Sequence, residues 1–193
     1  MKINHTPNYT DWQQASFDSL SFELKGAVLR REEDWAAGLD WITIEPPFCH
    51  QVHPGIWVGS CESATQGKFL EDNNIKTIVN FYVGYPYEVA EDITQHQFFL
   101  SDGKMPFCGI YPKVAEVIHE ARQQGHGVLV HCQAGVSRSS TGVLTYLMLH
   151  EGIGWEDGVA QLKAARPMVC PHPLLMRGVI RDLGDKFLLK TKK

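Results

Sequence analysis

The chain has 193 residues and a formal net charge of -4, and 44% of its residues are hydrophobic and 21% charged. This length suits one domain of ordinary size, with or without an appendage, and the composition excludes disorder throughout. The slightly acidic balance argues against general binding of nucleic acid, and no apolar run reaches the ~18 residues that a membrane span needs.

The first residues, MKINHTPNYTDW, contain no apolar stretch after their lysine, so we expect no secretory signal. The cysteines are odd in number and lack close pairing, which is typical of thiols in a reducing compartment. We therefore expect a cytoplasmic protein, with the nucleus also open. The five cysteines are Cys49, Cys61, Cys108, Cys132 and Cys170.

Composition changes along the chain and divides it into three parts. Residues 1–46 hold a helical pattern at 23–39, and either an extension packed on the main domain or a partly mobile tail fits them. Residues 47–189 form the main domain, and 190–193 form a basic tail. The role of the extension stays open.

From His53 onward, short apolar runs alternate with stretches of helical periodicity. This alternation predicts an α/β fold with a central, mostly parallel sheet flanked by helices. Ligands of such sheets bind beyond the carboxyl ends of the strands. The expected strands are 56–58, 75–80, 98–100 and 128–130, and the expected helices are 62–73, 110–122, 139–150, 155–165 and 173–189.

The sequence HCQAGVSRSS at 131–140 lies between the last expected strand and a helix. A glycine in such a loop lets the backbone N–H groups curl around an anion, and the helix N-terminus adds positive potential. Arg138 offers a planar fork for phosphate oxygens, and these surroundings lower the pKa of a thiol such as Cys132. A structural cysteine in a tight turn is the alternative, but the whole combination favours nucleophilic attack on phosphorus.

The loop HCQAGVSRSS resembles the active-site loop of the cysteine-dependent dual-specificity protein phosphatases, in the protein tyrosine phosphatase superfamily, whose pattern is HCxxGxxRS. The segments HPGIWVGS, NNIKTIVNF and ARPMVCPHP are similar to further parts of that family. One departure is His172, which stands where asparagine is more usual.

The resemblance implies hydrolysis of phosphomonoesters through a phosphocysteine intermediate. Cys132 would attack phosphorus, Ser139 would donate a hydrogen bond to its sulfur, and His131 would support the loop. The residues implied in phosphate binding are Gln133, Ala134, Gly135, Val136, Ser137 and Arg138.

The mechanism also needs a general acid on a separate loop. Asp102 follows an expected strand, precedes Gly103 and lies at a position that resembles the acid loop of the family. A turn residue is the alternative for this Asp-Gly pair. Asp92 and Glu91 are weaker candidates, because they precede the strand and should lie at its far end.

We expect no cofactor and no metal, since Arg138 and the backbone amides supply the positive charge. Cys49, His50 and His53 lack the further ligand that a structural zinc site needs. The tyrosines that follow the second expected strand fit either the rim of the active site or packing of the loop. These are Tyr82, Tyr85 and Tyr87.

The predicted function is hydrolysis of phosphotyrosine and of phosphoserine or phosphothreonine in a protein substrate. Gln133, Ala134 and Val136 carry no charge, which favours a protein over a phosphoinositide substrate. A phosphoinositide or phosphoglucan phosphatase and a phospho-binding scaffold with low turnover are the alternatives. Tyrosine-only and dual specificity both stay open, as does the oligomeric state, and no nucleic-acid or membrane partner is expected.

Overall fold

The computed structural model describes residues 47–84, 86–101 and 103–188. The helix expected at 23–39, the rest of the extension and the basic tail lie outside these residues. The division of the chain at residues 46 and 189 therefore stays a prediction.

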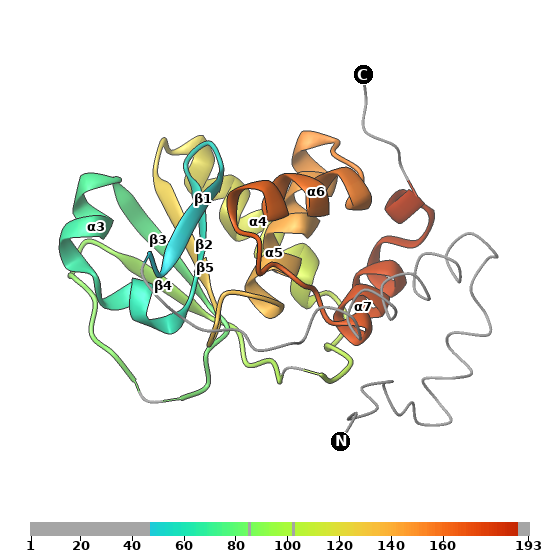
Figure 1. The fold of residues 1–193 in the computed structure, drawn as a ribbon, viewed down its shortest axis with the longest axis horizontal. Coiled ribbons are helices and arrows are strands. Elements are labelled where there is room, and N and C mark those ends of the chain that lie inside the picture. The colour runs from blue at the N-terminus through green and yellow to red at the C-terminus, as the bar shows by residue number, and fades with distance from the viewer. Residues whose placement is uncertain (1–46, 85, 102, 189–193) are drawn as a thin grey trace.

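A five-stranded sheet with the order β1-β2-β5-β3-β4 forms the centre of the domain (Figure 1). β1 is antiparallel to β2, whereas β2, β5, β3 and β4 are all parallel. The α/β fold with a mostly parallel sheet is thus confirmed. The strands are β1 Cys49–His53, β2 Ile56–Gly59, β3 Ile75–Asn80, β4 Thr94–Gln97 and β5 Gly127–His131.

Helices cover both faces of the sheet (Figure 1). One face carries η1 Cys61–Thr65 and α3 Gly67–Asp72, and the other carries four longer helices with short continuations. No helix in the described part of the chain is long and apolar enough to cross a membrane. The helices of the second face are α4 Ile110–Gln123, α5 Arg138–Tyr146 with η2 Leu147–Glu151, α6 Trp155–Ala165, and α7 Pro173–Leu183 with η3 Gly184–Leu188.

The central strand β5 is buried along its whole length, which explains its uninterrupted apolar sequence. Because side chains alternate along a strand, Val128 and Val130 pack on the four-helix side and Leu129 on the α3 side. The strand is thereby fixed from both faces. Its last residue, His131, is the first residue of the candidate site.

The strand expected at 98–100 is wrong, because the structure places β4 at Thr94–Gln97. β4 is an edge strand of polar residues, and its backbone pairing with β3 defines it. The apolar residues that suggested a strand follow it instead. Phe98 packs on Phe81 and Leu100 is buried, so the apolar character of these two residues indicates packing in the core and not a strand.

Three helices differ from their expected extents, and β1 was not expected. The helix at 62–73 divides at Gln66 into the short η1 and α3. The helix at 139–150 ends in a π-helical turn, and the last helix ends at Leu183, before the positive φ of Gly184. The helices expected at 110–122 and 155–165 are confirmed to within one residue.

Replacing Leu129 by alanine should reduce the free energy of unfolding by about 2–5 kcal/mol, because its side chain is fully buried on the face of the sheet that α3 covers. Urea unfolding would measure this change. Lys68→Ala removes an exposed ion pair with Asp72 and should cost less than about 1 kcal/mol. Equal losses in the two variants would contradict the assigned core.

Candidate active site

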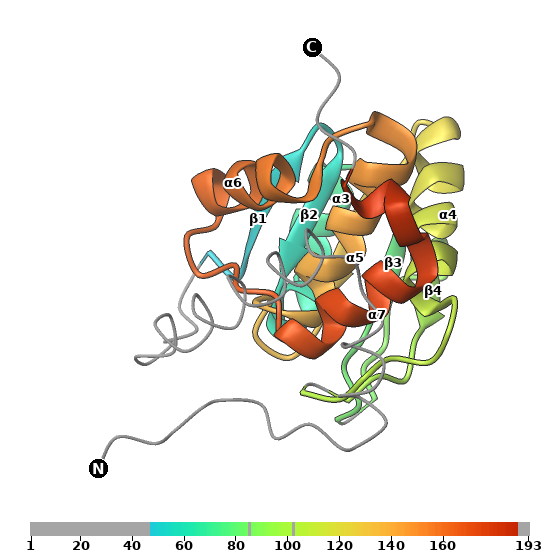
Figure 2. The same ribbon diagram turned by 90° about the vertical axis from the view of Figure 1, so that its right-hand side faces the viewer.

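The loop of residues 132–137 joins the carboxyl end of β5 to the start of α5. The parallel strands β2 and β3 flank β5 and end at the same edge of the sheet. α5 is the central helix of its layer, between α6 and α4 and against α7 (Figure 2). The motif found in the sequence therefore occupies the place where parallel sheets bind ligands.

The backbone carbonyls of the loop are all held from outside it. Arg166 donates from Nη2 to the carbonyl of Ala134 (2.9 Å) and from Nε to that of Gly135 (2.8 Å). The N–H groups of Cys61 and Cys170 bind the carbonyls of Gln133 (3.0 Å) and Val136 (2.9 Å). The Ser137 carbonyl accepts from α5. In a trans peptide group the N–H points away from the carbonyl. Because the carbonyls are held on the outside, the N–H groups of these peptide groups face the loop interior.

Gly135 is required by this curled backbone for two reasons. Its φ is +70°, a left-handed conformation that favours glycine. A Cβ at this position would also lie 2.5 Å from the carbonyl carbon of Gly59 and 2.8 Å from Nη2 of Arg166. A side chain here would therefore displace the loop from β2 and from the arginine that holds it.

Cys132 lies at the base of the loop and is almost fully buried. Burial by itself raises the pKa of its thiol, but the Ser139 hydroxyl, the Arg138 guanidinium and the N–H groups of Ser139 and Val136 outweigh burial and lower the pKa. The Ser139 Oγ lies 3.3 Å from the sulfur. By contrast, burial raises the pKa of Cys49 and of Cys61 to about 11. The site thus favours a thiolate at Cys132.

Arg138 is the first residue of α5, and its guanidinium is buried at the strand ends. Its Nη1 donates to the carbonyls of Phe81 (3.1 Å) and Leu100 (3.2 Å). Phe81 follows β3 directly and Leu100 comes shortly after β4, so two segments beyond the sheet fix the cation. A permanent positive charge beside the sulfur suits a dianionic phosphate.

His131 supports the loop as a neutral side chain. Its Nδ1 donates to the carbonyl of Cys132, so its Nε2 is the acceptor for the Tyr87 hydroxyl. Gln95 in turn donates to Tyr87 (3.2 Å). Burial, together with Arg138, lowers the pKa of His131 to about 4 although Glu62 and the Cys132 carbonyl oppose the shift.

The structure brings the predicted residues from 131 to 139 together, whereas Asp102 lies outside the described residues. Asp92 pairs with Lys76 at the start of β3, far from the carboxyl ends of the strands, so it is not the general acid. Glu91 precedes the same edge strand β4. Tyr87 supports His131, and Tyr85 lies outside the described residues.

The two histidines of β1 have partners in the protein. His50 Nδ1 accepts from Arg166 Nη1 at 2.9 Å, and His53 Nδ1 lies 3.1 Å from Gln161 Nε2. None of the five cysteines, all of which lie in the described residues, forms a disulfide. No group of three or more potential metal ligands lies together in the part of the chain that the structure describes.

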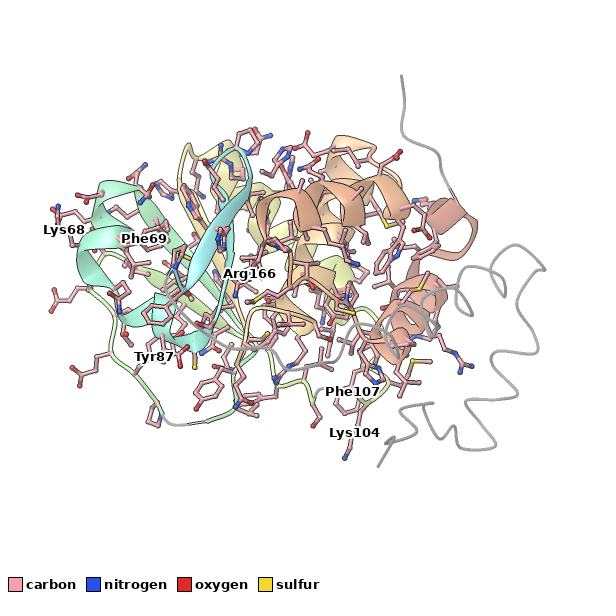
Figure 3. The ribbon with its side chains drawn as sticks, in the orientation of Figure 1. Lys68, Phe69, Tyr87, Lys104, Phe107 and Arg166 are labelled. Atoms are coloured by element: carbon pink, nitrogen blue, oxygen red, sulfur yellow. The ribbon has the colours of Figure 1, made fainter. Side chains whose placement is uncertain are left out.

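Sequence reasoning missed the role of Arg166, and for Tyr87 it left open the rim of the active site or packing of the loop. Arg166 is only 1% exposed, and Figure 3 shows it inside the domain beside β1, where His50 lies. An arginine at the end of an amphipathic helix normally predicts a solvated side chain, so only its place in the segment ARPMVCPHP was a signal. His172 caps α7 by accepting from the N–H of Leu174, a task that asparagine also performs well.

The family model of the dual specificity phosphatase catalytic domain matches residues 56–181, which include the whole of this loop. The chain belongs to this family. The resemblance found in the sequence is thus confirmed, and the match lies within the predicted main domain.

Similarity to individual proteins supports the same family. The chain is 35% identical over 124 residues to dual specificity protein phosphatase 15 of Rattus norvegicus, a match that covers 64% of this chain and 52% of that protein. It is 30% identical over 149 residues to dual specificity protein phosphatase 22 of Mus musculus, covering 70% and 71% of the two chains. The crystal structure of DUSP15 has a TM-score of 0.63 and 29% identity, and the match covers 73% of this chain and 91% of that one. The chain spans about half the length of the first curated relatives it matches.

Replacing Ser139 by alanine should raise the pKa of the Cys132 thiol, because the hydroxyl that stabilises the thiolate by a hydrogen bond is lost. The pH dependence of alkylation by iodoacetamide measures this pKa. Thr145→Val is a matched control, because the Thr145 hydroxyl bonds to the Thr141 carbonyl in the same helix. Unchanged alkylation midpoints in Ser139→Ala would contradict the assigned contact.

The lowered pKa of His131 predicts a pH-dependent stability. Between pH 6.5 and about 4 the unfolded chain binds a proton at this histidine that the folded chain does not bind, so stability falls as the pH falls through this window. The contribution is about 3 kcal/mol. The free energy of unfolding of the unmodified protein should therefore fall relative to that of His131→Gln by this amount as the pH is lowered from 6.5 to about 4. Unfolding measured at several pH values tests this. A difference that stays constant would show that His131 is not held neutral.

Proposed function

We propose that the chain is a cysteine-dependent phosphomonoester hydrolase that acts on phosphotyrosine and on phosphoserine or phosphothreonine of a protein substrate. The observation that carries this proposal is the lowered pKa of Cys132 inside a loop whose carbonyls are all held from outside. Membership of the dual specificity phosphatase family supports the same chemistry.

In the first step the Cys132 thiolate attacks phosphorus, and the bond to the ester oxygen breaks. A sulfur–phosphorus bond forms while the leaving oxygen takes a proton from Asp102. The guanidinium of Arg138 and the N–H groups of residues 133–138 hold the three remaining oxygens, most tightly when charge builds up on them in the transition state. Positive charge from these groups makes a metal unnecessary in this mechanism.

In the second step water attacks the phosphocysteine and transfers a proton to the carboxylate of Asp102. Inorganic phosphate leaves and the thiolate forms again. Ser139, with its hydroxyl 3.3 Å from the sulfur, stabilises the departing thiolate. His131 acts through the loop and takes no part in proton transfer.

The assignment of Asp102 as general acid rests on the chain on either side of it. The carbonyl of Leu100 accepts from Arg138. A Cβ at Gly103 would lie 3.6 Å from Nε2 of His172, and the N–H of His172 donates to Ser137 in the phosphate-binding loop. Both flanking segments therefore support a place beside the loop for the acid.

Two features support a protein substrate and a reducing compartment. A phosphoinositide headgroup with several phosphates would favour additional positive charge in the loop. Gln133, Ala134 and Val136 add none. A thiolate nucleophile works only while it is reduced, so we infer that the protein acts in the cytoplasm or in another compartment of that kind.

Replacing Asp102 by asparagine should lower kcat by roughly 100-fold or more on a phosphothreonyl peptide, whose leaving oxygen needs a proton. On para-nitrophenyl phosphate, which has an acidic leaving group, the loss should be much smaller. Steady-state kinetics on both substrates test this difference. An unchanged kcat on the phosphothreonyl peptide would overturn the assignment.

Cys132→Ser is the matched control for the mechanism, because it exchanges only the nucleophilic atom. It should abolish turnover of phosphotyrosyl and phosphothreonyl peptides and of para-nitrophenyl phosphate. Turnover by Cys132→Ser at the rate of the unmodified protein would contradict the mechanism. Faster hydrolysis of a phosphoinositide or a phosphoglucan than of either peptide would contradict the protein substrate.

A further inference from the structure

A pocket of about 310 Å³ lies at the ends of β3 and β4. β3 contributes Asn80, and β4 contributes Gln95 and Gln97. Val83 and Phe99 also line the pocket and are unusually exposed for apolar side chains, at 57% and 73%. Exposed apolar side chains at a pocket suggest a surface that becomes covered by a partner.

Two hydrogen bonds connect the wall of this pocket with the candidate active site. Asn80 and Tyr82 line it, and the residue between them, Phe81, gives its carbonyl to Arg138 Nη1 at 3.1 Å. Tyr87 lines it as well, and its hydroxyl donates to His131, the residue before Cys132. These two links are the reason to expect that the residues next to a phosphorylated one lie at this pocket when the phosphate binds Arg138.

Several polar groups of the pocket are bonded to one another. Gln97 Nε2 donates to the carbonyls of Asn80 and Tyr82, both at 3.1 Å. The Asn80 Oδ1 accepts from the N–H of Tyr82 at 2.6 Å, and Gln95 Nε2 donates to Tyr87. These bonds fix the shape of the wall, and they let the pocket accept a side chain that offers no hydrogen bonds.

No charged residue is present among the described residues that line this pocket. A carboxylate or a second phosphate placed here would lose water without gaining a cation, which is costly. A leucine or phenylalanine side chain would instead gain contact with Val83 and Phe99. The pocket therefore discriminates between neighbours of the phosphorylated residue by their charge.

We propose that this pocket is a specificity subsite that binds an apolar side chain one or two positions from the phosphorylated residue of the substrate. The inference rests on the proposed protein phosphatase activity. It assigns the substrate class as singly phosphorylated segments with an apolar neighbour, and it excludes segments with an acidic or phosphorylated residue at that position.

The test compares phosphotyrosyl peptides that differ only by leucine or glutamate at each position within two residues of the phosphotyrosine. At one of these positions the leucine peptide should have a kcat/KM about tenfold higher, the size expected for burying part of one apolar side chain. Phe99→Lys places a cation at the pocket and should reduce the preference to less than about threefold. Equal rates for leucine and glutamate at every position would overturn the subsite.

Phe107→Lys is the matched control, because Phe107 is 77% exposed, is not among the residues lining this pocket and lies along the lower side of the domain in Figure 3, to the right of Tyr87. It should keep the leucine preference of the unmodified protein, and an equal loss in both variants would overturn the assignment to this pocket. Para-nitrophenyl phosphate is too small to reach the pocket and should be hydrolysed equally by all three proteins. Failure to hydrolyse it at all would contradict the proposed function, whereas its hydrolysis without any neighbour preference would contradict the subsite alone.

Discussion

The orientation of the peptide groups between Cys132 and Arg138 depends on what holds their carbonyls. A carbonyl left inside the loop would repel both a thiolate and a phosphate. Arg166 prevents this for two successive residues, Ala134 and Gly135, and the backbone of Cys61 and of Cys170 does so on either side. Because these partners come from η1, from the residue that follows α6 and from the segment before α7, the loop keeps its shape only when the whole domain is folded. The anion site is thus a property of the tertiary structure.

Among the described residues, the surroundings favour the ionised form of Cys132 and the neutral form of His131. Arg138 lies between carbonyls that follow β3 and β4, and this fixes a cation beside the sulfur. His131, although next to Cys132, is kept neutral by burial and by the nearby charge of Arg138, which outweigh the opposing effects of the Cys132 carbonyl and Glu62. A protonated histidine there would add a second charge that could move with pH. The arrangement gives Cys132 a lowered pKa that depends on fixed groups.

Sequence patterns predicted the fold class, strand β5 and the nucleophilic loop because each has strong local causes. A buried central strand is continuously apolar, and a loop that curls around an anion needs its glycine, here Gly135 at φ +70°. The edge strand β4 was placed wrongly because its polar residues carry no strand pattern, and pairing with β3 defines it. Arg166 and Tyr87 support the loop from 31 and 44 residues away in the chain, a relation that no local pattern contains.

The central claim is that Cys132 forms a covalent bond to phosphorus, and trapping that bond tests it most directly. The protein would be mixed with a phosphotyrosyl peptide, quenched within milliseconds and digested, and the modified residue identified by mass spectrometry. We predict a phosphate on Cys132 that appears before free phosphate and disappears as the substrate is consumed. A phosphate on Ser139 or His131, or steady turnover with Cys132 unmodified at every time point, would contradict the nucleophilic role of this thiolate.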